Sequence, residues 1–286
     1  ADGGSSDLSR DIGGSERWLL NVNRHLGTMH GTDVQMDFLP LFGREGALAP
    51  EIEASGSRIH DLRFSWSMAG RGFRELRSIF ENGRFDVVHC HADYLGGVVL
   101  PAAARAGVTF KVNHIHNTRF AFDTPDRPWR WLGGKVLRQV ALRFADLTVG
   151  CSADALAAFV GPAATRGPTA VLYCGTPLAA YHDAIRVARS EARAALGMAP
   201  DQACIVHVGR HVEPKNVSFL LESFRALRTR GGRAHLLLVG SGPLTAQLQG
   251  EAERLALQGV VHFLGDRADV PMILRAASVL ALPSIY

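Results

Sequence analysis

Two cations five residues apart follow a strand-like run in the stretch "ACIVHVGRHVEPKN". The apolar, β-branched run before them is typical of a buried strand, and the residues after them have the apolar spacing of a helix. Arg210 and Lys215 are therefore predicted at the carboxyl edge of a strand, beside the amino end of a helix. Anions bind at such positions because backbone N–H groups and the helix dipole point toward them. The spacing alone also fits two solvated surface cations.

Two histidine pairs occupy the ends of two other strand-like runs. His89 and His91 lie two residues apart, as do His114 and His116, so each pair shares one face of its strand. Neither pair has a CxxC or HExxH neighbour, and we expect no metal site. His89 is the first candidate for a plain structural or surface histidine. His116 is the candidate for chemistry, because it lies where the strand gives way to a loop.

Glycines follow two of the predicted strands. Gly209 lets the chain turn tightly before Arg210. Gly240 and Gly242 in "GSGP" lack the GxGxxG spacing of a dinucleotide site, so they indicate either a turn lining a nucleotide pocket or a plain strand-to-helix turn. The chain has no GxSxG or GxxxxGK[ST] motif, which argues against a serine hydrolase or a P-loop protein.

The elements that position these residues alternate along the chain. Helical patterns cover 15–26, 69–82, 94–107, 129–144 and 153–159, and strand patterns cover 34–41, 85–91, 108–116, 147–151, 169–174, 203–208, 234–239, 260–264 and 279–282. Such alternation predicts parallel sheets covered by helices on both faces. The strands form two series separated by a strandless stretch near 175–200, so we expect two doubly wound α/β domains, residues 1–178 and 179–286.

Composition excludes several classes of protein. The 286 residues are 47% hydrophobic and 20% charged, with a net charge of +4, which gives no argument for nucleic acid as a partner. Four scattered cysteines are typical of reduced thiols, so we expect a cytoplasmic protein. No apolar run approaches the roughly 20 residues that span a bilayer.

The helix predicted over 129–144 mixes cations with large apolar residues. Arg127, Arg130 and Lys135 alternate with Trp129 and Trp131. The pattern favours an ordinary surface helix with its apolar side inward. The alternative is a helix that lies on an anionic membrane, which would suit a lipid-linked acceptor and peripheral contact with the inner face of the membrane.

Seven stretches together resemble one family. They are "GGSER", "FDVVHCH", "HIHNT", "LYCGTPLAAY", "VGRHVEPKN", "LLLVGSGP" and "VVHFLGDRADVPMILRAASVLALPS". In this order they resemble retaining glycosyltransferases of the group 1, family 4 type, over nearly the whole chain and most specifically over 206–284. The resemblance implies the GT-B fold, in which two Rossmann-like doubly wound domains face each other across a cleft. The second domain would hold the nucleotide sugar, and the first would hold the acceptor.

The resemblance also implies roles for individual residues. The donor diphosphate would contact Arg210, Lys215, Gly13 and Gly14, and His116 would lie near the transferred sugar as the catalytic residue. The nucleotide pocket would include Gly209, Gly240, Gly242, Asp266 and Arg267, and the acceptor side would include His91, His114 and Asn117. No metal or other cofactor is implied, because fixed cations and amides can stabilise the leaving diphosphate.

The chain departs from the family pattern at both ends. An apolar strand normally precedes the Gly-Gly loop, and a Glu-x7-Glu motif normally follows the last residues present here. We therefore expect an interior piece of a longer enzyme, with the second domain incomplete, or a degenerate relative.

The expected activity is retaining transfer of a hexose-like sugar from a nucleotide sugar to a glycan or glycolipid, in polysaccharide or cell-envelope biosynthesis. The alternatives are a non-catalytic protein that binds sugar nucleotides or glycans, and a sugar-nucleotide 2-epimerase.

Overall fold

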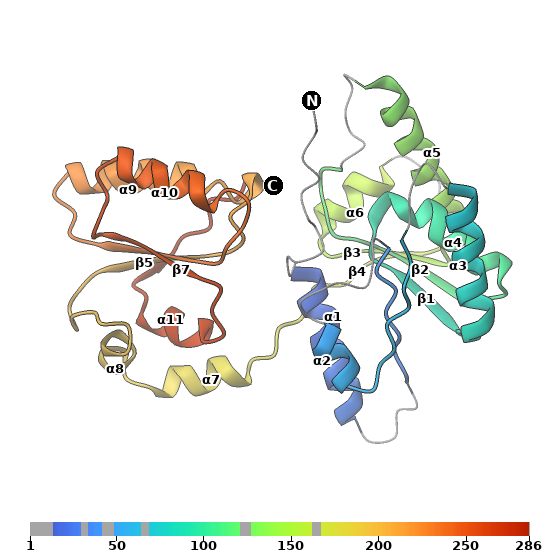
Figure 1. The fold of residues 1–286 in the computed structure, drawn as a ribbon, viewed down its shortest axis with the longest axis horizontal. Coiled ribbons are helices and arrows are strands. Elements are labelled where there is room, and N and C mark those ends of the chain that lie inside the picture. Colours follow the sequence, from blue (N-terminus) through green and yellow to red (C-terminus); the bar gives the residue numbers. More distant parts are fainter. Residues whose placement is uncertain are drawn as a thin grey trace. The chain divides into compact units, whose positions relative to one another are not determined.

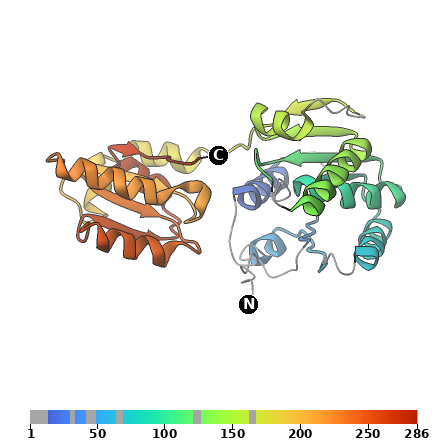
Figure 2. The ribbon, with the colours of Figure 1, turned by 90° about the horizontal axis from the view of Figure 1, so that it is seen from above.

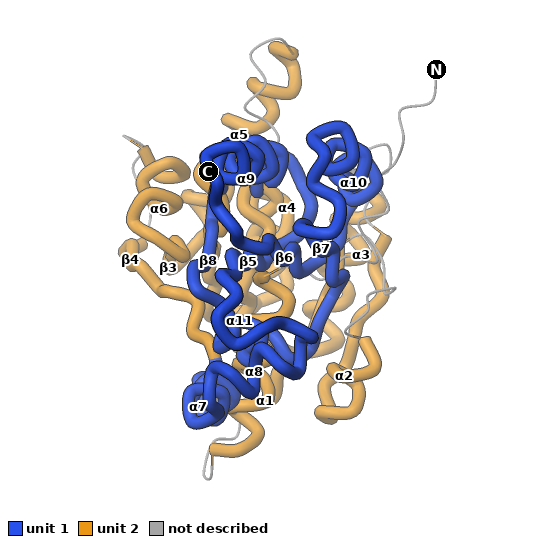
Figure 3. The backbone as a smooth tube through the Cα atoms, turned by 90° about the vertical axis from the view of Figure 1, so that its left-hand side faces the viewer, with its two compact units in different colours: residues 1–6, 177–286 blue, residues 7–176 orange. Residues whose placement is uncertain are grey.

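The computed structural model describes residues 14–29, 34–41, 49–63, 69–120, 127–161 and 167–285. The chain divides into two compact units, shown in different colours in Figure 3. The N-terminal unit comprises residues 7–176, and the C-terminal unit contains residues 177–286. Each unit is built around one parallel sheet (Figures 1 and 2).

The sheet of the N-terminal unit has four parallel strands in sequence order. They are β1 (Val87–Cys90), β2 (Phe110–Ile115), β3 (Leu147–Gly150) and β4 (Thr169–Val171). The helices are α1 (Gly14–Thr28), α2 (Ala49–Ala54), α3 (Ala69–Gly83), α4 (Gly96–Arg105), α5 (Pro128–Phe144) and α6 (Ala153–Val160), with the short 3-10 helix η2 (Asp93–Leu95) before α4. The strands predicted over 85–91, 108–116, 147–151 and 169–174 are thus confirmed within a few residues.

Alternate residues of these strands face opposite layers. Val88 packs with α3 and α4, and Ile115 packs with α5 and α6, in the apolar cores of one face. The histidines of β1 and β2 alternate with these core residues, so they face the other side, where α1 lies (Figure 1). Because apolar and polar residues alternate along the strands, these histidines lie on the face of the sheet opposite the apolar cores.

The prediction of a strand over 34–41 is wrong. In this segment only Phe38 pairs, through a single bridge with Ile59. Asp37 accepts a hydrogen bond from the backbone N–H of Arg58, and its carboxylate also lies 2.8 Å from a ring nitrogen of His60. The segment is extended, but its polar contacts and Pro40, which has no N–H to donate, leave it outside the sheet.

The sheet of the C-terminal unit also has four parallel strands. They are β5 (Cys204–Val208), β6 (His235–Val239), β7 (Val261–Gly265) and β8 (Val279–Leu280). The helices are α7 (Ala179–Arg186), α8 (Arg189–Ala194), α9 (Val217–Thr229), α10 (Thr245–Arg254) and α11 (Val270–Ala276), with the 3-10 helix η3 (Glu213–Lys215) before α9. Leu236 and Leu238 pack under α9 and α10, while Val206 and Leu237 pack against α11 on the other face (Figure 1).

The strand order of this sheet reverses beside β5. The order is β7-β6-β5-β8, so the chain moves from β5 through β6 to β7 in one direction and then crosses back to pair β8 with β5. Connections that leave a sheet in opposite directions open a crevice at the carboxyl ends of the strands between them. The loop that follows β5 therefore lies at the ligand-binding position of a doubly wound fold.

Candidate functional site

Two loops of the C-terminal unit pack backbone to backbone at this position. We call residues 209–216 the β5 loop and residues 240–244 the β6 loop. The N–H of Gly209 donates to the carbonyl of Val239 at 2.9 Å. Gly240 has a φ of 122°, and a Cβ atom placed on it would lie 2.2 Å from the carbonyl oxygen of Gly209. Only glycine fits here without a shift, since both the conformation and the space exclude a side chain.

Lys215 lies directly over the turn at Gly209. Its Cδ atom is 3.7 Å from the position that a Cβ on Gly209 would occupy. Asn216 has left-handed backbone angles, and α9 begins at the next residue. Lys215 and the half-buried Arg210 therefore lie within one loop, between the end of β5 and the amino end of α9.

The remaining nucleotide-pocket candidates have different surroundings. A Cβ on Gly242 would lie 2.6 Å from the carbonyl oxygen of His211, which is a second close approach between the β5 and β6 loops. Ser241 donates a 2.6 Å hydrogen bond to Asp266, so the turn after β7 is joined to the same loops. Arg267 forms two 2.7 Å hydrogen bonds with Asp269 instead, and this pairing lowers the pKa of the Asp269 carboxyl.

Two buried histidines support the β5 loop, and sequence reasoning missed both of them. His207 of β5 donates from Nδ1 to the carbonyl of Ala281 at 2.9 Å. His211 hydrogen-bonds the hydroxyl of Thr245 at 2.9 Å. Both side chains are fully buried, and burial lowers both pKa values. Neutral imidazoles thus lie next to the two cations, where a charged ring would repel them.

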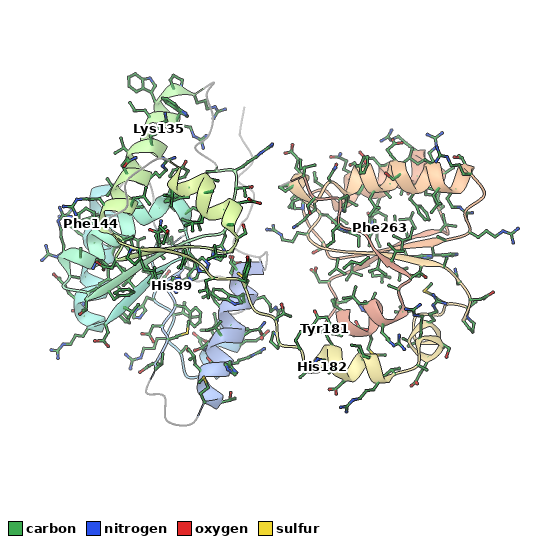
Figure 4. The ribbon with its side chains drawn as sticks, turned by 180° about the vertical axis from the view of Figure 1, so that it is seen from behind. His89, Lys135, Phe144, Tyr181, His182 and Phe263 are labelled. Carbon is green, nitrogen blue, oxygen red and sulfur yellow. The ribbon has the colours of Figure 1, made fainter. Side chains whose placement is uncertain are left out.

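Four histidines of the N-terminal unit meet on the sheet face that carries α1 (Figure 4 labels His89). Nδ1 of His114 lies 3.2 Å from Nε2 of His89, and Nδ1 of His91 lies 2.9 Å from Nε2 of His116. The rings of His114 and His116 stack with centroids 4.3 Å apart. The two H-x-H motifs therefore interlock across the β1–β2 pair.

Trp18 of α1 covers this group. Its ring meets His91 and His114 edge-on, with centroids 5.7 Å and 5.4 Å away. Burial, followed by the neighbouring imidazoles, lowers the pKa of His91 to about 2 and that of His114 to about 3. The same causes lower the pKa of His89 to about 4, although part of that residue remains exposed. These rings are consequently neutral at pH 7.

Asp93 fixes the loop that follows β2, and sequence reasoning missed it. Its carboxylate accepts hydrogen bonds from the backbone N–H of His116 at 3.0 Å and from the side-chain amide of Asn117 at 2.7 Å. Asp93 has a φ of 46°, which a residue with a Cβ adopts only where its surroundings hold it. Its place two residues after His91 was the one signal available. The candidate acceptor residues His91, His114 and Asn117 thus lie in one network with His116.

The two glycines proposed for phosphate contact are placed less fully. Gly13 lies outside the described residues. Gly14 is the first residue of α1, and a Cβ placed on it would meet no described atom within 4 Å. Backbone approach to a ligand at this helix start is therefore sterically open among the described residues.

Two units in one chain, each built on a Rossmann-like parallel sheet, match the GT-B fold of glycosyltransferases. A solved structure of the same fold is HepE of Anabaena in complex with UDP-glucose, which superposes with a TM-score of 0.73 at 20% identity. The alignment covers 96% of this chain and 71% of HepE.

Family comparisons make the assignment specific. Residues 12–180 match the model of Glycosyltransferase Family 4, and residues 202–286 match that of Glycosyl transferases group 1. The putative glycosyltransferase EpsF of Bacillus subtilis is 34% identical, over 96% of this chain and 71% of EpsF. A GDP-mannose-dependent phosphatidylinositol dimannoside mannosyltransferase of Mycobacterium tuberculosis is 30% identical, over 84% of this chain and 70% of that protein. The chain therefore belongs to the family 4, group 1 glycosyltransferases, and it is a transferase.

Proposed function

We propose that this chain catalyses retaining transfer of a hexose-like sugar from a nucleoside diphosphate sugar to a glycan or glycolipid, in polysaccharide or cell-envelope biosynthesis. The observation that carries the proposal is the packing of the β5 and β6 loops, which holds Arg210 and Lys215 at the switch point of the sheet. The complex of HepE with UDP-glucose and the GDP-mannose dependence named for the mycobacterial relative support a nucleotide sugar as the donor. Retention of configuration follows from the resemblance to retaining members.

The chemistry of the leaving group explains why two cations are needed. As the glycosidic bond breaks, the departing diphosphate gathers negative charge. Arg210 offers a planar fork that can bridge two phosphate oxygens, and Lys215 adds a compact charge at the amino end of α9. Fixed donors of this kind stabilise the transition state more than the ground state, so the reaction proposed here needs no metal ion.

The histidine network would serve the sugar and the acceptor. We assign the catalytic role to His116, whose backbone N–H is held by Asp93. Neutral imidazoles can each donate and accept one hydrogen bond, which suits recognition of hydroxyl groups. His91, His114 and Asn117 are the proposed acceptor-side residues, and the nucleotide would be bordered by Gly209, Gly240, Gly242 and Asp266, with Arg267 at its margin.

The decisive experiment is calorimetric titration of the chain with UDP, GDP and ADP and with the corresponding nucleosides. Charge-assisted hydrogen bonds contribute roughly 1.5–3 kcal/mol each, so Arg210→Ala or Lys215→Ala should weaken diphosphate binding about ten- to a hundredfold. The affinity for the bare nucleoside should stay unchanged. Arg233→Ala, which removes an exposed cation from the loop before β6, is the matched control. Equal affinities in parent, variants and control would identify Arg210 and Lys215 as solvated surface charges.

Turnover separates this proposal from its two rivals. A transferase consumes the sugar nucleotide only when an acceptor is present. A non-catalytic relative would bind the nucleotide without any turnover, and a 2-epimerase would convert the sugar nucleotide without an acceptor. Incubation of the enzyme with each sugar nucleotide, with and without membrane lipid extract, distinguishes the three.

We also propose that the amino-terminal half of α5 contacts an anionic membrane, which would bring the enzyme to a lipid-linked acceptor. Trp129 is 85% exposed, and Leu132 and Val136 are exposed beside it. Nζ of Lys135 lies 3.5 Å from the ring centroid of Trp131. No acidic residue occurs between Arg127 and Phe144. This half of α5, marked by Lys135 in Figure 4, extends away from the sheet, while Phe144 marks the half beside it.

An exposed surface that is both apolar and basic matches the chemistry of an anionic bilayer. Among the described helices, none is long and apolar enough to cross a membrane. The test is sedimentation with vesicles that contain or lack an anionic phospholipid. Trp129→Ser with Leu132→Ser should reduce binding to anionic vesicles, whereas Phe219→Ser, at an exposed phenylalanine of α9, should not. Binding that is equal for all variants would contradict this part of the proposal.

A further inference from the structure

Three of the four clustered histidines are close enough to share a metal ion. We call His89, His91 and His114 the three-histidine cluster. One ring nitrogen from each lies within 4.8 Å of the others. Within the ranges that the structure describes, this is the one group of three or more histidines, cysteines or carboxylates with such spacing.

The spacing can be compared with that of a bound zinc ion. With Zn–N bonds of about 2.0–2.1 Å and tetrahedral angles, two ligand nitrogens lie about 3.4 Å apart. The 3.2 Å between the nitrogens of His89 and His114 is already close to this value. Since the three nitrogens all lie within 4.8 Å of one another, no separation needs to shorten by more than about 1.4 Å, which small ring rotations can supply.

The cluster also contains buried nitrogens with no hydrogen-bond partner among the described residues. They are Nε2 of His91 and Nε2 of His114, and His114 is fully buried. An unsatisfied buried nitrogen costs free energy whether it carries a proton or a lone pair. A metal ion bound through Nε2 of His91 would satisfy that lone pair, while His114 would bind the same ion through Nδ1, the nitrogen 3.2 Å from Nε2 of His89.

The surroundings are those of a metal site rather than of a closed core. Nδ1 of His91 lies 2.9 Å from His116, which can therefore orient the ring from outside the ligand set, as outer partners of metal-bound histidines do. His89 remains partly exposed and provides a path from solvent. Trp18 closes the other side of the cluster.

From these contacts we propose that the three-histidine cluster binds one borderline divalent transition-metal ion, with Zn²⁺ as the first choice. Three imidazoles without a carboxylate or thiolate suit Zn²⁺, Ni²⁺, Co²⁺ or Cu²⁺ and do not suit Mg²⁺ or Ca²⁺. The ion joins β1 to β2 at the carboxyl edge of the sheet. No step of the transfer reaction proposed above uses the ion. His91 and His114 are also proposed acceptor-side residues, and the metal titration below contains neither sugar nucleotide nor acceptor, so it tests this site separately from that function.

The test uses the untagged chain, freed of metal by dialysis against a chelator. Titration with Zn²⁺ against a chromophoric chelator should give one ion per chain at micromolar affinity or tighter. Titration with Co²⁺ should give the visible absorption of a tetrahedral site. His89→Ala removes a partly exposed ligand and should abolish this binding, whereas His116→Ala removes the outer partner and should weaken it about 10- to 100-fold.

His25→Ala is the matched control, because His25 is an exposed histidine of α1 in the same unit. It should bind as the parent does, and circular dichroism should show that all variants are folded. The proposal is overturned if the parent binds no Zn²⁺ above the level of His89→Ala, or if Co²⁺ stays octahedral. Weak binding that His89→Ala leaves unchanged would have the same meaning, because it would come from histidines elsewhere.

Discussion

Gly240 lies where the backbones of the β5 and β6 loops meet, and we expect Gly240→Ala to damage both stability and donor binding. The added Cβ would lie 2.2 Å from the carbonyl oxygen of Gly209 and 2.9 Å from its carbonyl carbon. Nonbonded heavy atoms prefer separations of about 3.5 Å, so one loop must move by about 1 Å. Both atoms belong to the backbone, so no side-chain rotation can relieve the contact.

The expected loss in the free energy of unfolding is the sum of two costs. Overpacking a closely packed site costs about 1–3 kcal/mol. The φ of 122° at Gly240 is reached by glycine but adds about 1–2 kcal/mol for a residue with a Cβ. We therefore expect Gly240→Ala to lower the free energy of unfolding by about 2–5 kcal/mol. Because the displaced loop carries Arg210, affinity for a nucleoside diphosphate should fall at least about tenfold.

The assay uses the distribution of tryptophans. All four, at positions 18, 66, 129 and 131, belong to the N-terminal unit. Tryptophan fluorescence therefore follows urea unfolding of that unit, whereas circular dichroism follows both units. Gly240→Ala should lower the midpoint of the transition seen by circular dichroism and leave that seen by fluorescence unchanged. Titration with UDP and GDP measures the loss of affinity.

Gly250→Ala is the control. Gly250 lies within α10, and a Cβ there would meet no described atom within 4 Å. Alanine is the better helix former, so this change should stabilise the unit by up to about 1 kcal/mol and leave nucleotide affinity intact. The prediction is refuted if Gly240→Ala unfolds at the parent midpoint and binds UDP and GDP with parent affinity. The close packing of the two loops would then contribute nothing measurable to stability or to nucleotide binding.

Three further predictions concern other parts of the molecule. His116→Ala should lower kcat while nucleotide affinity stays nearly constant, and an unchanged kcat would leave His116 only a structural role. Burial lowers the folded-state pKa of His207, so below pH 6.5 the unfolded chain takes up the proton first, and the C-terminal unit should lose stability as the pH falls. His207→Asn, which keeps a donor for the same carbonyl, should lose less unfolding free energy than the parent between pH 7.5 and pH 5.0. Urea denaturation followed by circular dichroism measures this loss, and an equal loss in parent and variant would argue against a neutral His207. A Cβ on Gly97 would lie 2.3 Å from a backbone carbonyl of α5, so Gly97→Ala should cost about 1–3 kcal/mol by tryptophan fluorescence, whereas Gly133→Ala, with open space around it, should not.

The regular parts of the fold could be predicted because their signals are local. The β-branched run before Gly209 and the apolar spacing after Lys215 each lie within a few residues, and β5 and α9 occur where they indicate. The alternation of side chains along a strand also placed each histidine pair on one face. The strand expected over 34–41 failed because apolarity alone does not supply a pairing partner, and Asp37 makes its contacts to the segment around His60 instead.

The remaining features of the candidate site depend on residues that are distant in sequence. His89 and His114 are 25 residues apart, and their contact is set by the register of β1 on β2. Trp18 reaches the same rings from α1. The need for glycine at position 240 comes from the backbone at 209, which no spacing rule could reveal. Asp93 acts through a backbone conformation rather than through a motif.

The strand order of the C-terminal unit has a consequence for the order in which the proposed donor site forms during folding. β5 is the first strand of its sheet along the chain, yet one of its two neighbours, β8, is the last. The hydrogen bond from His207 to Ala281 spans 74 residues. During synthesis, the β5 loop is therefore made early. The second neighbour of β5, which is β8, is made only after β6, β7 and α11. Since long-range closures form slowly, the β5 loop should be among the last parts of this unit to become rigid, and a nucleotide bound at the proposed site would favour the completed sheet over its precursors.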